Sequence, residues 1–350
     1  MLDGLSDASL MALAGLFGGI LLGLAARLGR FCTLGAIEDF LYQHSSIRLR
    51  MWFLAIGTAI IGAYGLAATG RMELAQTTYL AAGWSPVATV MGGLIFGYGM
   101  SIAGHCGFGA LARTGGGDFR AFVIVLVMGI SAYVMQSGPL AGLRVALVES
   151  TTVDMGAASI PGLLGQAAGI SHIALGLALG TAVTVAAIWS AEMLRNGRAM
   201  IWAAVVGAAI VSGWWGTSWV VNTHFSHMPV VSHTFSAPLG ESLIYLMTSS
   251  GGGLSFGVGS VGGVLAGAFA GSLVKGHFRW EACEDPRELR RQVLGAVLMG
   301  FGSVLALGCT IGQGLSAFSV LAISAPVTFA AIFAGAAIGL RQLITGFAAP

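Results

Sequence analysis

The sequence predicts an all-α polytopic membrane protein, and three observations support this fold class. Only 9% of the 350 residues are charged, whereas 56% are hydrophobic. Soluble domains carry about 25% charged residues, so this chain has too little polar surface to cover a body surrounded by water. Apolar segments of about 20 residues, the length that crosses a hydrocarbon core, recur along the chain. One glycine-rich cysteine motif also occurs twice, which indicates an internal duplication.

Nine apolar segments are predicted to be membrane-spanning helices. They cover residues 9–26, 51–69, 85–103, 121–136, 171–190, 199–221, 252–274, 293–307 and 321–340. Four shorter apolar segments are too short to cross the membrane and suit interfacial or re-entrant helices. These lie at residues 35–42, 139–148, 160–168 and 239–247. The whole chain, residues 1–350, is therefore expected to form a single membrane domain.

The distribution of lysine and arginine predicts how the spans are oriented. With nine spans, 14 of the 16 basic residues fall on one side of the membrane, and only Arg71 and Arg144 fall on the other. Basic residues in short loops are retained in the cytoplasm. We therefore expect a periplasmic N-terminus and a cytoplasmic C-terminus.

The duplication centres on two cysteines. Shifting the chain by 203 positions lays Cys106 onto Cys309, together with four glycines and an alanine around them. Five crossings separate the two cysteines, so the equivalent loops hang from opposite faces of the membrane. The sequence therefore predicts two inverted repeats, at about 9–136 and 199–344, joined by a connector helix at 171–190. Inverted repeats are typical of transporters, whose substrate site lies near the membrane midplane where the repeats meet.

The surroundings of Cys106 and Cys309 favour anion binding. Each cysteine follows a glycine-rich helix end and precedes another helix, so the backbone can approach a ligand closely. The free N–H groups and the positive dipole at a helix start suit an anion. Glycines that only pack tight helices would give a similar pattern, but the repeated cysteine favours a functional site. His105 and Gln313, which lie close to these cysteines in the sequence, are candidate binding residues.

Cys32 is a third candidate, placed after the first span on the predicted cytoplasmic side. Arg27 and Arg30 precede it by about one helical turn, where they would attract an anion and lower the pKa of the thiol. The alternative is that these arginines anchor the helix end while Cys32 only fills space. Cys283, the fourth cysteine, lies among acidic residues and is interpreted as incidental.

No metal or cofactor site is predicted. The chain has no Cys-x-x-Cys pair, so neither a dithiol redox site nor a zinc knuckle is indicated. His224, His227 and His233 fall in a predicted outer loop at a spacing that suits a metal, but loop histidines are more often simply solvated. The basic residues are too scattered for nucleic acid binding, and the spans lack the carboxylates of a proton pump.

Three segments resemble the YeeE/YedE family of sulfur-compound transporters. They are Phe-Cys-Thr-Leu-Gly-Ala at 31–36, Gly-His-Cys-Gly-Phe-Gly at 104–109, and Phe-Gly-Ser-Val-Leu-Ala-Leu-Gly-Cys-Thr-Ile-Gly-Gln-Gly at 301–314. The resemblance covers nearly the whole chain, in length, span number and three cysteine positions.

This resemblance implies a bacterial inner-membrane protein with an hourglass-like central path, along which Cys32, Cys106 and Cys309 lie. It implies thiosulfate as the substrate and a small cytoplasmic sulfur carrier of the TusA type as a partner. We therefore expect a transporter rather than an enzyme, one that takes up thiosulfate or a related small sulfur oxyanion. Thiols donate weak S–H hydrogen bonds, and weak sites in series allow an ion to move on.

Two alternatives remain open at the level of sequence. A membrane sulfurtransferase or thiol oxidoreductase would form a persulfide on one cysteine. A channel for a neutral small solute would transport its substrate without competition from thiosulfate.

Overall fold

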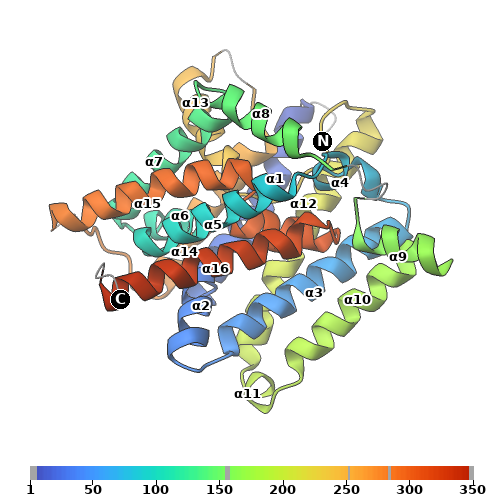
Figure 1. Ribbon diagram of the computed structural model, residues 1–350, viewed down its shortest axis with the longest axis horizontal. Helices are drawn as coiled ribbons and strands as arrows, with labels where there is room; N and C mark the ends of the chain where they lie inside the picture. The colour runs from blue at the N-terminus through green and yellow to red at the C-terminus, as the bar shows by residue number, and fades with distance from the viewer. Residues whose placement is uncertain (1–5, 154–157, 251–252, 283–284, 347–350) are drawn as a thin grey trace.

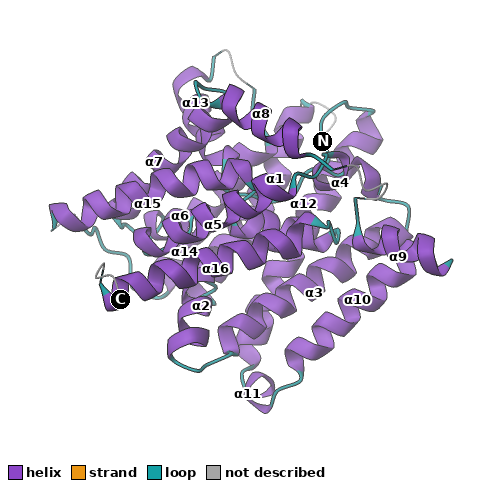
Figure 2. Ribbon diagram, in the orientation of Figure 1, coloured by secondary structure: helices purple, strands orange, loops and turns teal. Residues whose placement is uncertain are grey.

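The computed structural model describes residues 6–153, 158–250, 253–282 and 285–346. In these residues the chain forms helices joined by loops and isolated β-bridges (Figures 1 and 2). The elements are α1 (Asp7–Leu28), α2 (Thr33–Tyr42), α3 (Ile47–Ala68), the 3-10 helix η1 (Leu74–Gln76), α4 (Thr78–Ala81), α5 (Pro86–Ala103), α6 (Gly107–Thr114), α7 (Phe119–Gln136), α8 (Ala141–Thr151), α9 (Ile160–Ala168), α10 (His172–Ile188), α11 (Ala191–Leu194), α12 (Gly197–His224), α13 (Ala237–Thr248), α14 (Phe256–Val274), α15 (Pro286–Leu305), the π-helix η2 (Gly312–Ala317) and α16 (Ser324–Thr345).

The predicted all-α fold is confirmed, because a helix lies at each of the nine predicted spans and at each of the four shorter segments. Seven helical segments of the described chain are long and apolar enough to cross a membrane, with α1 and α2 counted together, as are α5 and α6. The remaining two predicted spans differ for separate reasons. Helix α10 has only 17 residues, and the first turns of α15 carry the charged sequence Pro-Arg-Glu-Leu-Arg-Arg. The count of nine crossings stays a prediction.

Polar residues fix where several of the long helices begin. Ser85, Asp118 and Ser255 precede α5, α7 and α14, and each side chain accepts a backbone N–H from the first turn. A helix start leaves such N–H groups without intrahelical partners. The three side chains supply acceptors to these groups and so stabilise the helix starts.

Glycines let α5 and α15 cross at close range in the core. Gly92 lies against Gly302 and Ala306, whereas Gly99 lies against Gly295, so the two helices run antiparallel. A Cβ atom added at Gly99 would lie 2.7 Å from the carbonyl oxygen of Gly295. A side chain at either position would therefore hold the backbones apart.

Helices α1 and α12 are also antiparallel, since Ala14 lies by Gly216 while Gly29 lies by Trp202. The contacts of these four helices with the remaining long helices follow the same pattern in both halves of the chain. Helix α1 packs on α14 as α12 packs on α3, and α5 packs on α16 as α15 packs on α7. Exchanging α1 with α12, α3 with α14, α5 with α15 and α7 with α16 reproduces this set of contacts. Helix α10 packs on α3 at the edge of the molecule (Figure 1).

Candidate functional site

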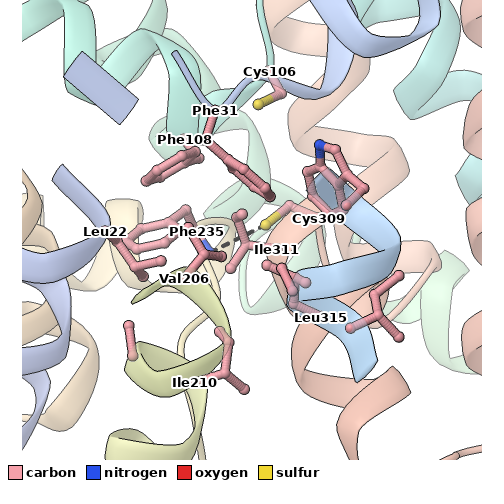
Figure 3. Close-up of a cluster of buried hydrophobic side chains, with 14 of the residues drawn as sticks. Leu22, Phe31, Cys106, Phe108, Val206, Ile210, Phe235, Cys309, Ile311 and Leu315 are labelled. Carbon is pink, nitrogen blue, oxygen red and sulfur yellow. Dashed lines mark hydrogen bonds between the residues drawn. The ribbon is translucent and has the colours of Figure 1, made fainter. Parts of the chain in front are cut away.

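The two thiols of the repeated motif lie in the same buried cluster. Cys106 and Cys309 are both fully buried, and their sulfur atoms lie among the rings of Phe31, Phe108 and Phe235 (Figure 3). The ring centroids of Phe108 and Phe235 are 5.3 Å apart. The space around the thiols is therefore closed by aromatic side chains in this conformation.

The turn between α5 and α6 positions Cys106. Gly104 ends α5 with φ +83°, a left-handed conformation that glycine adopts without strain. The turn places Cys106 at the N-cap of α6, where its Sγ accepts the backbone N–H of Gly109 at 3.4 Å. Thr33 begins α2, and its Oγ1 lies 3.9 Å from the same sulfur. The Cys106 thiol thus sits where two helix starts meet.

Cys309 has closely similar surroundings in the turn after α15. The backbone N–H of Phe235 donates to its Sγ at 3.2 Å, and Oγ1 of Thr234 lies 3.8 Å away. Thr234 stands just before α13, as Thr33 stands at the start of α2. Each buried thiol therefore faces a threonine hydroxyl and a backbone N–H, groups that donate hydrogen bonds to anions.

The Cys309 turn is strained, and Gln313 braces it. Leu307 takes the place that Gly104 has in the first motif and has φ +56°, a conformation that disfavours a non-glycine residue by about 1–2 kcal/mol. The buried Gln313 donates from Nε2 to the carbonyl oxygens of Ala306 at 2.9 Å and Leu307 at 3.3 Å. The amide N–H groups of Gln313 are thus directed to backbone, and its predicted contact with an anion stays a prediction.

A cavity of about 460 Å³, which we call the basic vestibule, reaches the Cys106 turn. Its arginine and lysine lining residues are Arg27, Arg30, Arg48, Arg113 and Lys275, and the histidines His105 and His277 also line it. Glu38 is the acidic residue in the lining. Burial, with smaller contributions from Arg198, Arg30 and Arg27, lowers the pKa of Lys275 from its ordinary value. An anion in the vestibule would relieve this repulsion between like charges.

The basic vestibule brings together four residues that the sequence predicted. Arg27, Arg30, Cys32 and His105 all line it. Arg27 donates from Nε to the hydroxyl of Ser272 at 2.7 Å, which fixes its side chain at the wall. Cys32 is half-buried at the N-cap of α2. Both ring nitrogens of His105 are buried without a hydrogen-bond partner in the described part of the chain.

A second cavity, of about 350 Å³, reaches the Cys309 turn, and we call it the second vestibule. Its polar lining residues are Thr78, Tyr79, Gln136, Arg144, Ser232, Thr234, Ser236 and Ser303. Gly308, the neighbour of Cys309, also lines it. The two vestibules share no lining residue. Cys106 adjoins the first and Cys309 the second, so the buried thiols lie between them.

The prediction of a solvated outer loop for His224, His227 and His233 is wrong for the last of these. His233 is fully buried, and its Nδ1 lies 2.6 Å from the hydroxyl of Ser260. The chain folds back against α12 before it reaches His233, as the hydroxyl of Ser232 donates to a carbonyl of that helix at 2.8 Å. Among the described residues, no group of three His, Cys, Asp or Glu side chains is placed to hold a metal ion.

Sequence reasoning singled out the cysteines but missed the threonines that face them. A shift of 201 positions lays Thr33 onto Thr234, two residues less than the shift that relates the cysteines. The same register places His233 where the first half has Cys32. Cys283, interpreted as incidental, lies outside the described residues.

Two curated proteins are similar to this chain over most of its length. Thiosulfate transporter TsuA of Escherichia coli (strain K12) is 28% identical over 317 residues, which cover 87% of each chain. Thiosulfate transporter TsuA of Spirochaeta thermophila is 24% identical over 337 residues, which cover 90% of this chain and 93% of the relative. A family model described as sulphur transport matches residues 28–338. That match takes in the chain from the end of α1 to within α16, including both cysteine turns, and the chain therefore belongs to the sulphur transport family.

Proposed function

We propose that this protein takes up thiosulfate, or a related small sulfur oxyanion, across the bacterial inner membrane. The ion passes the second vestibule, then Cys309 and Cys106, and leaves through the basic vestibule beside Cys32. One observation carries this proposal: two buried thiols, each facing a threonine hydroxyl, lie between two cavities that share no lining residue. The family and the names of the two relatives support the substrate.

The chemistry around the thiols fits an ion that must shed water. A dianion loses several kcal/mol or more of hydration in an apolar interior unless fixed donors replace the water. The backbone N–H of Phe235, now on the Cys309 sulfur at 3.2 Å, and the hydroxyl of Thr234 are such donors. The thiols add weak S–H bonds and a polarizable surface for the terminal sulfur of thiosulfate. Weak sites in series hold the ion briefly, as conduction requires.

We infer that the two halves of the chain are inverted repeats. Equivalent helices of such repeats run antiparallel, because the axis that relates them lies in the membrane plane. The antiparallel pairs α5 with α15 and α1 with α12 support this arrangement, as do the reciprocal contacts of α3, α7, α14 and α16. Helix α10 is then the connector. The arginine and lysine residues that line the basic vestibule favour a cytoplasmic position for it, and we propose that a TusA-type carrier receives the sulfur there.

Uptake of radiolabelled thiosulfate into liposomes containing the purified protein tests the thiol path. The double variant Cys106→Ala, Cys309→Ala is expected to lose nearly all uptake, and Cys32→Ala is expected to lose part of it. Cys283→Ala is the matched control and should behave as the unmodified protein. Full uptake by the double variant would sink the proposed path.

The same preparation separates the two other classes of function. Hydrogen-bonding thiols predict partial uptake in the Cys→Ser variants and no change in protein mass after exposure to thiosulfate. A persulfide enzyme predicts total loss in Cys→Ser and an added sulfur on one cysteine. A neutral-solute channel predicts that thiosulfate, sulfate, sulfite and selenium analogues do not compete for the transported substrate.

A further inference from the structure

Arg144 lines the second vestibule. The proposed path past the thiols gives this cationic side chain no role. We propose that Arg144 is the capture and selectivity residue of this vestibule, which binds the sulfonate end of the incoming oxyanion before it reaches Cys309. This inference rests on the proposed function and deepens it by assigning the entry site.

Arg144 lines the same cavity as Thr234 and Gly308, which flank Cys309 in space and in sequence. Thr234 therefore lies between the cavity that Arg144 lines and the sulfur of Cys309, which is 3.8 Å from the Thr234 hydroxyl. An ion held by Arg144 inside a cavity of about 350 Å³ is in position to be passed to the thiol.

The guanidinium of Arg144 is poorly satisfied by the protein itself. Its Nη2 donates to the backbone carbonyl of Gln136 at a long 3.4 Å. Its Nε is buried without a hydrogen-bond partner in the described residues, and the ion pairs of that part of the chain do not include Arg144. A buried donor without a partner is unfavourable, and more so when the group is charged. An anion would supply the missing acceptor.

Helix α8 holds Arg144 on a fixed support rather than on a free loop. The hydroxyls of Thr151, at the end of α8, and Ser85, at the start of α5, lie 2.5 Å apart. Val153 donates its backbone N–H to the carbonyl of Trp84 at 2.9 Å. A binding group on a fixed element loses less conformational entropy when it takes its ligand.

The adjoining cavity shows why the ion would choose the side with Arg144. This cavity, of about 410 Å³, shares Thr78, Val231, Ser232, Thr234 and Ala237 with the second vestibule, but its charged lining residue is Glu241 where the second vestibule has Arg144. A carboxylate repels a dianion, whereas a guanidinium can donate two parallel N–H bonds to two oxygens of a sulfonate group. Bound in this way, thiosulfate would keep its terminal sulfur free for the thiol.

Uptake kinetics in liposomes test this assignment with the variants Arg144→Gln, Arg144→Lys and Arg71→Gln. Arg71 is the matched control, because it is the other basic residue of the predicted outer side, is exposed, and lines neither cavity. Arg144→Gln is expected to raise KM for thiosulfate about tenfold or more at a similar maximal rate, because it removes charge-assisted hydrogen bonds, which are stronger than neutral ones. Arg144→Lys keeps the charge but loses the paired N–H geometry, so its KM should fall between the two.

Salt provides a second readout that a merely structural role would not change. Added salt screens a charge that attracts the ion, so KM of the unmodified protein should rise with ionic strength, and KM of Arg144→Gln should rise less. Unchanged KM and salt dependence in a folded Arg144→Gln would overturn the capture role while uptake by the unmodified protein upholds the proposed function. If Arg144→Gln does not fold, a KM for Arg144→Lys equal to that of the unmodified protein overturns it. Absence of any oxyanion uptake by the unmodified protein overturns both.

Discussion

Thr234 gives the sharpest test of how the thiol site binds an ion. Its half-buried side chain lines the second vestibule, and its Oγ1 lies 3.8 Å from the sulfur of Cys309. The variant Thr234→Val keeps the shape of the side chain and removes the hydroxyl. We expect it to lower the uptake efficiency for thiosulfate while it leaves the protein folded.

The size of the effect follows from what the hydroxyl contacts. The hydroxyl of Thr234 lies 3.8 Å from the Cys309 sulfur and within hydrogen-bond reach of Tyr79, so its loss should change the free energy of unfolding by about 0.5–1.5 kcal/mol. A hydrogen bond to an ion contributes about 1.5–3 kcal/mol. Since 1.4 kcal/mol corresponds to a factor of ten, uptake efficiency should fall roughly 10- to 150-fold.

Initial rates of uptake over a range of thiosulfate concentrations would measure this loss. Thr234→Ser keeps the hydroxyl and should retain most of the efficiency. Thr217→Val is the structural control, because the buried hydroxyl of Thr217 donates to the carbonyl of Val231 at 2.8 Å and reaches neither vestibule. It should lower the melting temperature and leave KM unchanged. Equal efficiency in Thr234→Val and the unmodified protein would refute the role of the hydroxyl.

Two further predictions concern packing. Gly99→Ala should lower the melting temperature in detergent, because its Cβ would lie 2.7 Å from the carbonyl of Gly295 and overpacking is unfavourable by about 1–3 kcal/mol; Gly65→Ala, with no heavy atom within 4 Å of its Cβ, should be neutral or stabilising. Gln313→Leu should also lower the melting temperature, since it leaves backbone carbonyls of the Cys309 turn without a donor. Adding Leu307→Gly should restore part of the lost melting temperature, because glycine adopts the left-handed conformation of residue 307 without strain. An unchanged melting temperature in this double variant would contradict the bracing role of Gln313.

The helices and the cysteine motif were predictable because both are properties of local sequence. Apolar length alone places a helix at residues 171–190, and the repeated glycines mark the turns around Cys106 and Cys309. Whether a helix crosses a membrane also depends on the residues at its ends. Helix α15 has 20 residues, but because its first turns are charged it is not among the helices that are apolar enough to cross.

Side-chain partners were not predictable, because they come from distant parts of the chain. His233 is buried against Ser260, which lies 27 residues further along the chain. Its position after a long span predicted a solvated loop, and this prediction was wrong for His233. Gln313 bonds to nearby residues, yet the turn that it braces has a leucine in the left-handed conformation. Nothing in a leucine indicates that conformation, whereas a glycine at the same place would have done so.

The unequal charge of the two vestibules has a thermodynamic consequence. Five arginine and lysine side chains line the basic vestibule, and Arg144 is the basic residue in the lining of the second. Fixed charges set how long an ion dwells at each end of a path, but they cannot alter its concentration ratio at equilibrium. An inside-negative potential of 100 mV opposes entry of a dianion by about 4.6 kcal/mol, or more than a thousandfold in concentration. Net uptake of thiosulfate through this protein would therefore need a coupled cation or rapid chemical consumption of the ion inside the cell.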